Sequence, residues 1–217
     1  MARNKYPEET IKLILAVSRR LFCEKGYENT SIQDIVDNLG GLSKGAIYHH
    51  FKSKEEIFAA VCDQIGQENV AYYDGILANK GSSGLEKLRA IFRSAYANPN
   101  NDMVVAMADK LVSDPKFLVN IIKENYELVA PLYIEPAIRQ GMADGSIKTD
   151  HPKQLAEVII TLLNIWLNPM VNVPEPGDIV RRVEFFDNML CSMGLPIFDQ
   201  EIKAQCISYC EKYNSVK

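Results

Sequence analysis

Hydrophobic residues recur at helical spacing along most of this chain of 217 residues. Near residues 30–39 they predict a short helix with one buried face. Its apolar positions are Ile32, Ile35, Val36 and Leu39. Ser31 and Asp34 have the spacing of a capping box at its start. Gly40 and Gly41 end the helix, because glycine adopts positive φ without steric cost.

A second short helix is predicted to begin at Ser43, a good N-cap, and to run to about Phe51. Ile47 and Phe51 lie four residues apart, so both can pack inward. The sequence therefore predicts two short helices around a glycine turn, the arrangement of a helix-turn-helix.

The outward face of the second helix suits a DNA groove. It carries Lys44, Gly45, Tyr48 and His49. Gly45 lets the backbone come close to DNA, Tyr48 and His49 offer hydrogen bonds and flat contacts, and Lys44 can meet a phosphate. A face that is only solvated would more often hold several charges. This face therefore predicts contact with a major groove.

The next helix begins close behind, because Ser53 and Glu56 form a second capping box. Lys54 lies in its first turn, where free backbone N–H groups favour an anion. We therefore expect Lys54 to anchor a phosphate.

The run LFCEKGYENTSIQDIV and the later run LSKGAIYHHFKSKEEIF resemble the N-terminal DNA-binding domain of the tetracycline-repressor (TetR) family of bacterial regulators. The resemblance covers about residues 8–65 and rests on a long, specific motif. The turn at Gly40-Gly41-Leu42 is one residue longer than the usual turn of the family. Such a turn would alter the angle of the recognition helix.

The resemblance and the motif together predict the residues that contact DNA. We expect Lys44, Tyr48 and His49 to read bases or backbone, and Ser31, Ser43, His50 and Lys54 to hold phosphates. The full predicted set is Ser31, Gln33, Ser43, Lys44, Gly45, Ala46, Tyr48, His49, His50 and Lys54.

The predicted fold is all-α. Residues 1–53 would form a three-helix helix-turn-helix domain, a linking helix would begin near residue 53, and residues 66–217 would form a larger helical domain for effector binding and dimerisation. Helices are expected over residues 8–25, 53–77, 85–97, 103–113, 115–140, 152–172, 178–193 and 199–213, with Pro and Gly at their boundaries. No pair of strands is predicted.

Two of these helices are candidates for a dimer interface. Residues 154–171 are apolar around most of the helix, so nearly every side must be covered. Residues 178–193 carry a second apolar stripe. In the family that the chain resembles, the last two long helices pair with a second subunit, although both helices could instead be core helices of a monomer.

Aromatic and methionine side chains in the second domain suit an adaptable apolar ligand site, although such residues also line ordinary cores. The predicted pocket residues are Phe92, Tyr96, Met103, Met107, Tyr126, Tyr133, Trp166 and Met170. The effector would be partly apolar.

The formal net charge is −4, but it is unevenly divided. Residues 1–54 carry nine Lys and Arg against six Asp and Glu, whereas residues 55–217 carry 15 against 22. The basic end is the end predicted to dock on phosphates. The charge excess is modest, so affinity should come from a dimer.

Five cysteines, an odd and scattered set, fit reduced thiols in a cytoplasm better than a disulfide framework. Cys206 and Cys210 share a helix face, but the sequence offers no further ligands for a metal there. We therefore expect small buried residues at both positions and no metal or cofactor. No apolar run reaches the length of a membrane span, and the first residues lack the apolar stretch of a secretory signal.

These features together predict a ligand-responsive, dimeric repressor that binds double-stranded DNA at a near-palindromic operator. A ligand-independent architectural protein that binds many chromosomal sites is the alternative. An enzyme is not expected, because no nucleophile elbow, phosphate loop, HExxH or paired CxxC motif occurs. His151 beside Asp150 fits the start of a helix better than a catalytic dyad.

Overall fold

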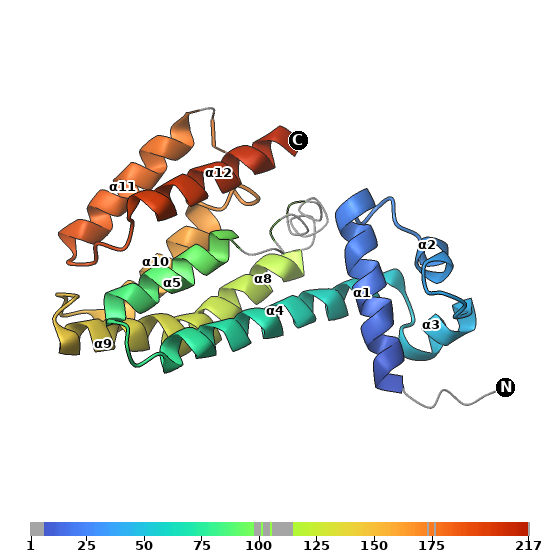
Figure 1. The fold of residues 1–217 in the computed structure, drawn as a ribbon. Helices are drawn as coiled ribbons and strands as arrows, with labels where there is room; N and C mark the ends of the chain where they lie inside the picture. The colour runs from blue at the N-terminus through green and yellow to red at the C-terminus, as the bar shows by residue number, and fades with distance from the viewer. Residues whose placement is uncertain are drawn as a thin grey trace. The chain divides into compact units, whose positions relative to one another are not determined.

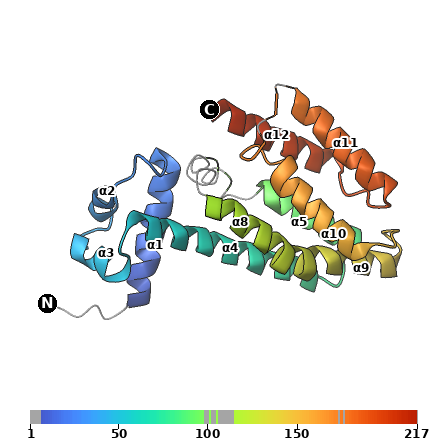
Figure 2. The ribbon, with the colours of Figure 1, turned by 180° about the vertical axis from the view of Figure 1, so that it is seen from behind.

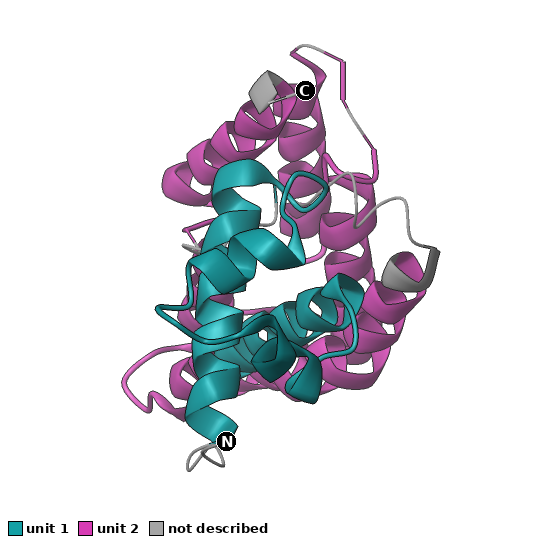
Figure 3. Ribbon diagram, turned by 90° about the vertical axis from the view of Figure 1, so that its right-hand side faces the viewer, with its two compact units in different colours: residues 1–70, 100–111 teal, residues 71–99, 112–217 magenta. Residues whose placement is uncertain are grey.

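The computed structural model describes residues 7–97, 101, 105, 115–172, 174–175 and 177–216, and within them every regular element is a helix. Two compact units are present (Figure 3). One holds Met1–Val70 with Asn100–Leu111, and the other holds Ala71–Pro99 with Val112–Lys217. The all-α prediction is confirmed. Of the helix expected at residues 103–113, only Val105 is described, and it is helical and buried.

The first unit contains α1 (Pro7–Lys25), α2 (Ile32–Asp37), α3 (Lys44–His50) and the first part of α4 (Lys54–Ala78) (Figure 1). Each of these helices has at least one apolar side chain that is completely buried. Examples, one from each helix, are Ile14, Ile35, Ile47 and Ile57. The helix-turn-helix is thus held on α1 and α4 by a shared core.

Local capping sets the path into α2. Gly26 ends α1 with a φ of 77°, and the buried Thr30 hydroxyl lies 2.8 Å from the Gly26 carbonyl, to which it donates. Both halves of the predicted capping box are present, since the Ser31 hydroxyl accepts from the Asp34 N–H and the Asp34 carboxylate accepts from the Ser31 N–H. These bonds satisfy donors that the first turn of a helix leaves free.

The turn between α2 and α3 uses both of its glycines. Gly40 has a φ of 63° and Gly41 a φ of 107°, conformations that other residues adopt only with strain. Helix α2 ends at Asp37, so Leu39 packs into the core from the turn rather than from the helix. The predicted turn at the glycine pair is present, but the helix predicted to reach Leu39 ends earlier, at Asp37.

The second unit contains the rest of α4, α5 (Gly84–Ala97), α8 (Pro115–Glu124), the π-helix η1 (Asn125–Ile134), α9 (Glu135–Asp144), α10 (Pro152–Thr161), the π-helix η2 (Leu162–Trp166), α11 (Asp178–Ser192) and α12 (Gln200–Val216). The ribbon seen from behind shows α10 beside α9 (Figure 2), and α10 also packs against η1. Within this unit α12 packs against α5 and α11.

Helices α5 and α9 approach each other closely at two glycines. A Cβ on Gly84 would lie 2.1 Å from the Gly141 backbone nitrogen, and a Cβ on Gly141 would lie 2.4 Å from the Ile147 side chain. The Gly84 N–H also donates to the Asp144 carboxylate at 2.8 Å. Gly141 therefore lies inside α9, and the helix ends instead at Gly145, which has a φ of 81°.

The helix predicted over residues 115–140 continues to Asp144, but its middle is π-helical. Pro131 lies inside η1. In an α-helix its ring would clash with the carbonyl four residues earlier. The wider turn of a π-helix relieves this contact.

The helix predicted over residues 152–172 is wrong at its end, because the helical turns stop at Trp166. Leu167 closes the last turn through its N–H to the Leu162 carbonyl. Asn168 precedes a proline, a position that disfavours helical backbone, and its side chain accepts from the Met170 N–H. These two features turn the chain away from the helix axis.

Candidate functional site

Helix α3 separates a buried side from an exposed side, as the sequence predicts. Ile47 is completely buried, whereas the neighbouring Tyr48 is 47% exposed. Lys44, Gly45 and His49 are exposed as well. The Lys44 ammonium lies 6.0 Å from the centre of the Tyr48 ring, so a cation and an aromatic ring occupy the same face.

The last two residues of α3 are His49 and His50, and they differ in exposure. The rings of His49 and His50 lie 5.0 Å apart with an interplanar angle of 73°. His49 is exposed and His50 is half-buried, as is Ala46 on the earlier turn. Ser43 has N-cap backbone geometry without a side-chain cap bond. Its exposed hydroxyl is therefore available to an outside acceptor such as a phosphate.

The two side chains at the start of α2 that are predicted to contact DNA, Ser31 and Gln33, already form hydrogen bonds within the protein. The Ser31 hydroxyl donates its single proton to the Asp34 carboxylate. A phosphate contact through this hydroxyl would need that bond to break. The Gln33 side-chain N–H donates to Asp37 at 2.7 Å. Both Ser31 and Gln33 are exposed.

Asp34 adds negative charge next to this surface, but Lys25 balances it. Their charged atoms lie 2.7 Å apart. The hydrogen bond from Lys25, together with those from Ser31, lowers the pKa of the Asp34 carboxyl far below its ordinary value. Asp34 therefore stays ionised and keeps its capping role at every pH near neutrality.

Lys54 has a structural role that the sequence did not reveal. Its ammonium donates to the Tyr27 carbonyl at 2.8 Å and lies 4.1 Å from the centre of the Tyr27 ring. The Tyr27 hydroxyl donates to Glu55 at 2.9 Å, and burial followed by this bond raises the pKa of Tyr27 above its ordinary range. The start of α4 is thus fastened to the loop after α1.

The second predicted capping box, at the start of α4, forms in only one of its two halves. The Glu56 N–H lies 3.3 Å from the Ser53 hydroxyl, as predicted, but the Glu56 carboxylate accepts from the Lys52 N–H rather than from Ser53. The Lys52 side chain is exposed beside these groups. Lys52 was not among the residues predicted to contact DNA, although it belongs to the same Lys-Ser-Lys run as Lys54.

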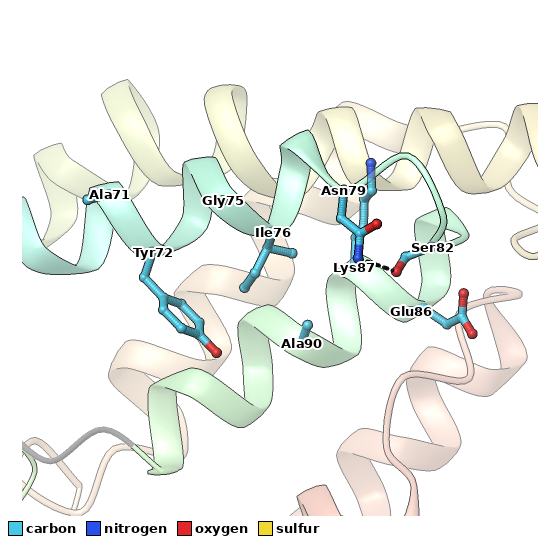
Figure 4. A pocket seen from close by; sticks show the side chains of 9 residues that line it. All are labelled: Ala71, Tyr72, Gly75, Ile76, Asn79, Ser82, Glu86, Lys87 and Ala90. Carbon is cyan, nitrogen blue, oxygen red and sulfur yellow. Dashed lines mark hydrogen bonds between the residues drawn. The ribbon is translucent and has the colours of Figure 1, made fainter.

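A groove of about 350 Å³ lies between the second half of α4 and the start of α5 (Figure 4). Small residues on both helices leave the space, and Tyr72, which is 56% exposed, stands at one end. Its lining is Ala71, Tyr72, Gly75, Ile76, Asn79, Ser82, Glu86, Lys87 and Ala90. None of the eight predicted pocket residues lines this groove.

The structure disperses the predicted pocket residues. Phe92 packs edge-on against Phe198, and Tyr133 lies 5.3 Å from Tyr73, so both fill the core. Met170 is buried as well, while Tyr126 is 48% exposed.

The two remaining described pocket candidates pair with residues of the C-terminal helices. The Tyr96 ring lies 6.1 Å from that of Tyr209, and the Trp166 ring lies 5.9 Å from that of Phe185. Met103 and Met107 lie outside the described residues.

None of the helices in the described part of the chain combines the length and apolar composition that crossing a bilayer requires. The same residues contain no cluster of three or more side chains of the His, Cys, Asp and Glu types that could hold a metal ion.

Comparison with known proteins gives concordant matches. The family model for "Bacterial regulatory proteins, tetR family" matches residues 14–61. The HTH-type transcriptional repressor AcnR of Corynebacterium diphtheriae is 32% identical over 184 residues, which cover 82% of this chain and 90% of the relative. The HTH-type transcriptional repressor KstR2 of Mycolicibacterium smegmatis is 30% identical over 142 residues, which cover 63% of this chain and 67% of the relative.

A solved structure shares the fold over most of both chains. It is a transcriptional regulator from Saccharomonospora viridis in complex with choline, 20% identical, with a TM-score of 0.63. The match covers 84% of this chain and 95% of that chain.

Proposed function

Because this chain belongs to the TetR family of DNA-binding transcriptional regulators, we propose that it is a dimeric repressor that leaves its operator when a small molecule binds. The observation that carries the proposal is the division of α3 into a buried Ile47 and an exposed face with Lys44, Tyr48 and His49. Such a face can enter a major groove while the core stays intact. The protein would regulate transcription in the cytoplasm and would not be an enzyme.

Within each half-site, Lys44, Tyr48 and His49 would read base edges or backbone, with Gly45 and Ala46 allowing close approach. Ser43 and His50 would hold phosphates at the two ends of α3. Lys54 would supply positive charge at the start of α4 while it fastens Tyr27. Ser31 and Gln33 would contact the backbone only after they exchange their bonds to Asp34 and Asp37.

The dimer would form through α10, η2 and α11. Large apolar side chains on these elements remain exposed, among them Val158 at 42% and Phe185 at 62%. The exposed Phe185 ring packs edge-on against the half-buried Trp166 ring, so the two form an aromatic pair. Covering such a surface with a second copy would stabilise the pair. A two-fold dimer would then present two recognition helices roughly 34–36 Å apart, one turn of DNA.

The effector would bind in the second unit, and the groove between α4 and α5 is the site we propose. Its lining includes Ala71, Tyr72 and Gly75 on α4, the helix whose first residues follow α3. An effector that prefers one position of this helix would shift the population of DNA-binding conformations. The choline complex of the Saccharomonospora viridis regulator supports a small molecule as effector.

Selection of binding sites from random duplex DNA with the purified chain tests this function. We expect recovery of one near-palindrome whose half-sites are one turn apart. A Tyr48→Ala variant is the control and should recover nothing. If the wild type enriched no sequence and bound all DNA with strong salt dependence, the repressor proposal would fail and the architectural alternative would replace it.

A further inference from the structure

A buried lysine belongs to the groove between α4 and α5. Lys87 on α5 is part of the lining, yet only 5% of the residue is exposed. Its ammonium donates to the Leu77 carbonyl and to the Gln140 side-chain oxygen, each at 2.7 Å. No carboxylate of the described residues forms an ion pair with Lys87. A buried charge whose partners are all neutral is costly, so this ammonium favours an anion from outside.

The end of α4 balances only part of this charge. Leu77 lies in the last turn of α4, where the helix dipole is equivalent to about half a negative charge. Gln140 is neutral, and its own amide donates to the Ser82 carbonyl at 2.8 Å. These contacts use two of the three ammonium N–H groups, and the third has no acceptor within the described part of the chain. Lys87 therefore keeps both positive charge and a donor.

The carboxylates in this part of the second unit are bound elsewhere. Glu86 also lines the groove, but its carboxylate accepts from the Ser83 N–H at 2.7 Å and from the Ser83 hydroxyl at 2.9 Å. In Figure 4 its side chain points outward from α5, away from the other lining side chains. The Asp144 carboxylate accepts from the Gly84 N–H at 2.8 Å and from the Ser146 N–H at 3.0 Å. Both acids thus serve the start of α5 and its neighbouring turn rather than Lys87.

The rest of the groove suits an apolar body. Figure 4 shows Tyr72 at the end opposite to Asn79 and Ser82, with Ile76 and Ala90 between them. A Cβ on Gly75 would have no atom within 4 Å, so the floor is open at this position. A volume of about 350 Å³ is enough for a small molecule. The groove therefore combines an apolar half with one cationic end.

We propose that this groove binds a small molecule with one carboxylate, held by the Lys87 ammonium, and an apolar body that lies towards Tyr72. The carboxylate accepts the free ammonium proton in a charge-assisted hydrogen bond. A single negative charge matches a single lysine, whereas a phosphate of nearly two charges would bring an excess of negative charge close to Glu86. The inference rests on the function proposed above, because it names the chemical class of the effector for the same groove.

Matched acids and amides test the charge. Calorimetric titration of the full chain compares octanoate with octanamide and naphthoate with naphthamide. We expect the acid of at least one pair to bind at least about tenfold more tightly than its amide. Lys87→Met should lose this preference. Lys80→Met is the control and should keep it, since Lys80 is an exposed lysine outside the lining.

Gly75→Leu provides a test that leaves Lys87 and its bonds to the end of α4 in place. The new side chain enters open space in the groove, so we expect loss of acid binding with an unchanged thermal midpoint. Equal affinities for acid and amide, an unchanged preference in Lys87→Met, acid binding by Gly75→Leu, or no binding of any probe at millimolar concentration would overturn the inference.

The effector role is measured separately, as release of the selected operator DNA. An acid that binds with the expected preference but leaves the DNA complex intact would refute the effector role and support the ligand class. Release of the DNA by an amide as readily as by its acid, abolished in Gly75→Leu, would support the effector role and refute the ligand class.

Discussion

Two neighbouring residues on α3 have different roles, one in the core and one on the face proposed to contact DNA. Ile47 has no exposed surface, and Tyr48 is nearly half exposed. Substitutions at these two positions should therefore affect different measurements, although the residues share one helical turn.

We expect Tyr48→Ala to abolish specific operator binding. The thermal midpoint and the dimer should stay unchanged, because the Tyr48 side chain is not buried in the core as that of Ile47 is. Ile47→Ala is the matched comparison and should lower the free energy of unfolding by about 2–5 kcal/mol through the cavity it leaves. Fluorescence anisotropy with the selected DNA and thermal unfolding measure the two effects. Normal operator binding by Tyr48→Ala would contradict our docking of α3.

The two lysines at the start of α4 offer a second comparison at this scale. Lys54→Ala should weaken binding to all DNA sequences and lower the salt slope by about one unit. It should also lower the thermal midpoint, because the bond to the Tyr27 carbonyl is lost. Lys52→Ala should lower the slope alone, since its side chain is exposed. An unchanged slope in Lys54→Ala would remove this residue from the proposed phosphate contacts.

At the scale of elements, hydrophobic spacing predicted most helices well but could not distinguish their kinds. The spacing and caps around α2 and α3 are local, so the helix-turn-helix was predictable from about 25 residues of sequence. The π-helices η1 and η2 were not, because an apolar stripe reads similarly in both kinds of helix. The early end at Trp166 depended on Asn168 and the proline after it, a signal that the strong apolar run concealed.

The crossing of α5 and α9 depends on glycine. Gly84→Ala should lower the free energy of unfolding by about 1–3 kcal/mol, because the new Cβ would meet Gly141 backbone that cannot move aside cheaply. Gly66→Ala in α4 is the control. Its Cβ would have no atom within 4 Å, so we expect a gain of up to about 1 kcal/mol from helix propensity. Urea unfolding measures both, and equal effects of the two would refute the close crossing.

At the scale of the whole molecule, charge and fold class could be predicted from the sequence, but the position of the groove could not. The exposed face of α3 follows from residues near one another in the sequence. The groove between α4 and α5 arises from where small residues such as Gly75 and Ala90 meet across two helices. Aromatic residues such as Phe92 and Tyr133 instead fill cores, and their type alone does not separate the two outcomes.

Acid should destabilise both units, because carboxylates in each have a lowered pKa. In the first unit, the hydrogen bond from Lys25 lowers the pKa of Asp34. In the second, bonds from Ser146 lower the pKa of Asp144, and bonds from Arg182 lower that of Asp178. A pKa that is lower in the folded state means that the unfolded chain binds protons first as pH falls. The stabilisation is complete above the unfolded value of about 3.9 and is lost below it.

We therefore expect the thermal midpoint to stay level from pH 7 to about pH 5 and to fall steadily below about pH 4, the range in which unfolded aspartates take up protons. Asp178→Asn removes one of these groups, so its midpoint should be lower than that of the wild type at pH 7, and the difference should shrink as the pH falls below about 4 towards the lowered pKa of the folded state. Asp150→Asn, at an exposed loop position, is the control and should follow the wild-type curve throughout. A constant difference between Asp178→Asn and the wild type across this range would show that the loss is one of packing, because only a proton-linked contribution disappears when the wild-type carboxyl is itself protonated.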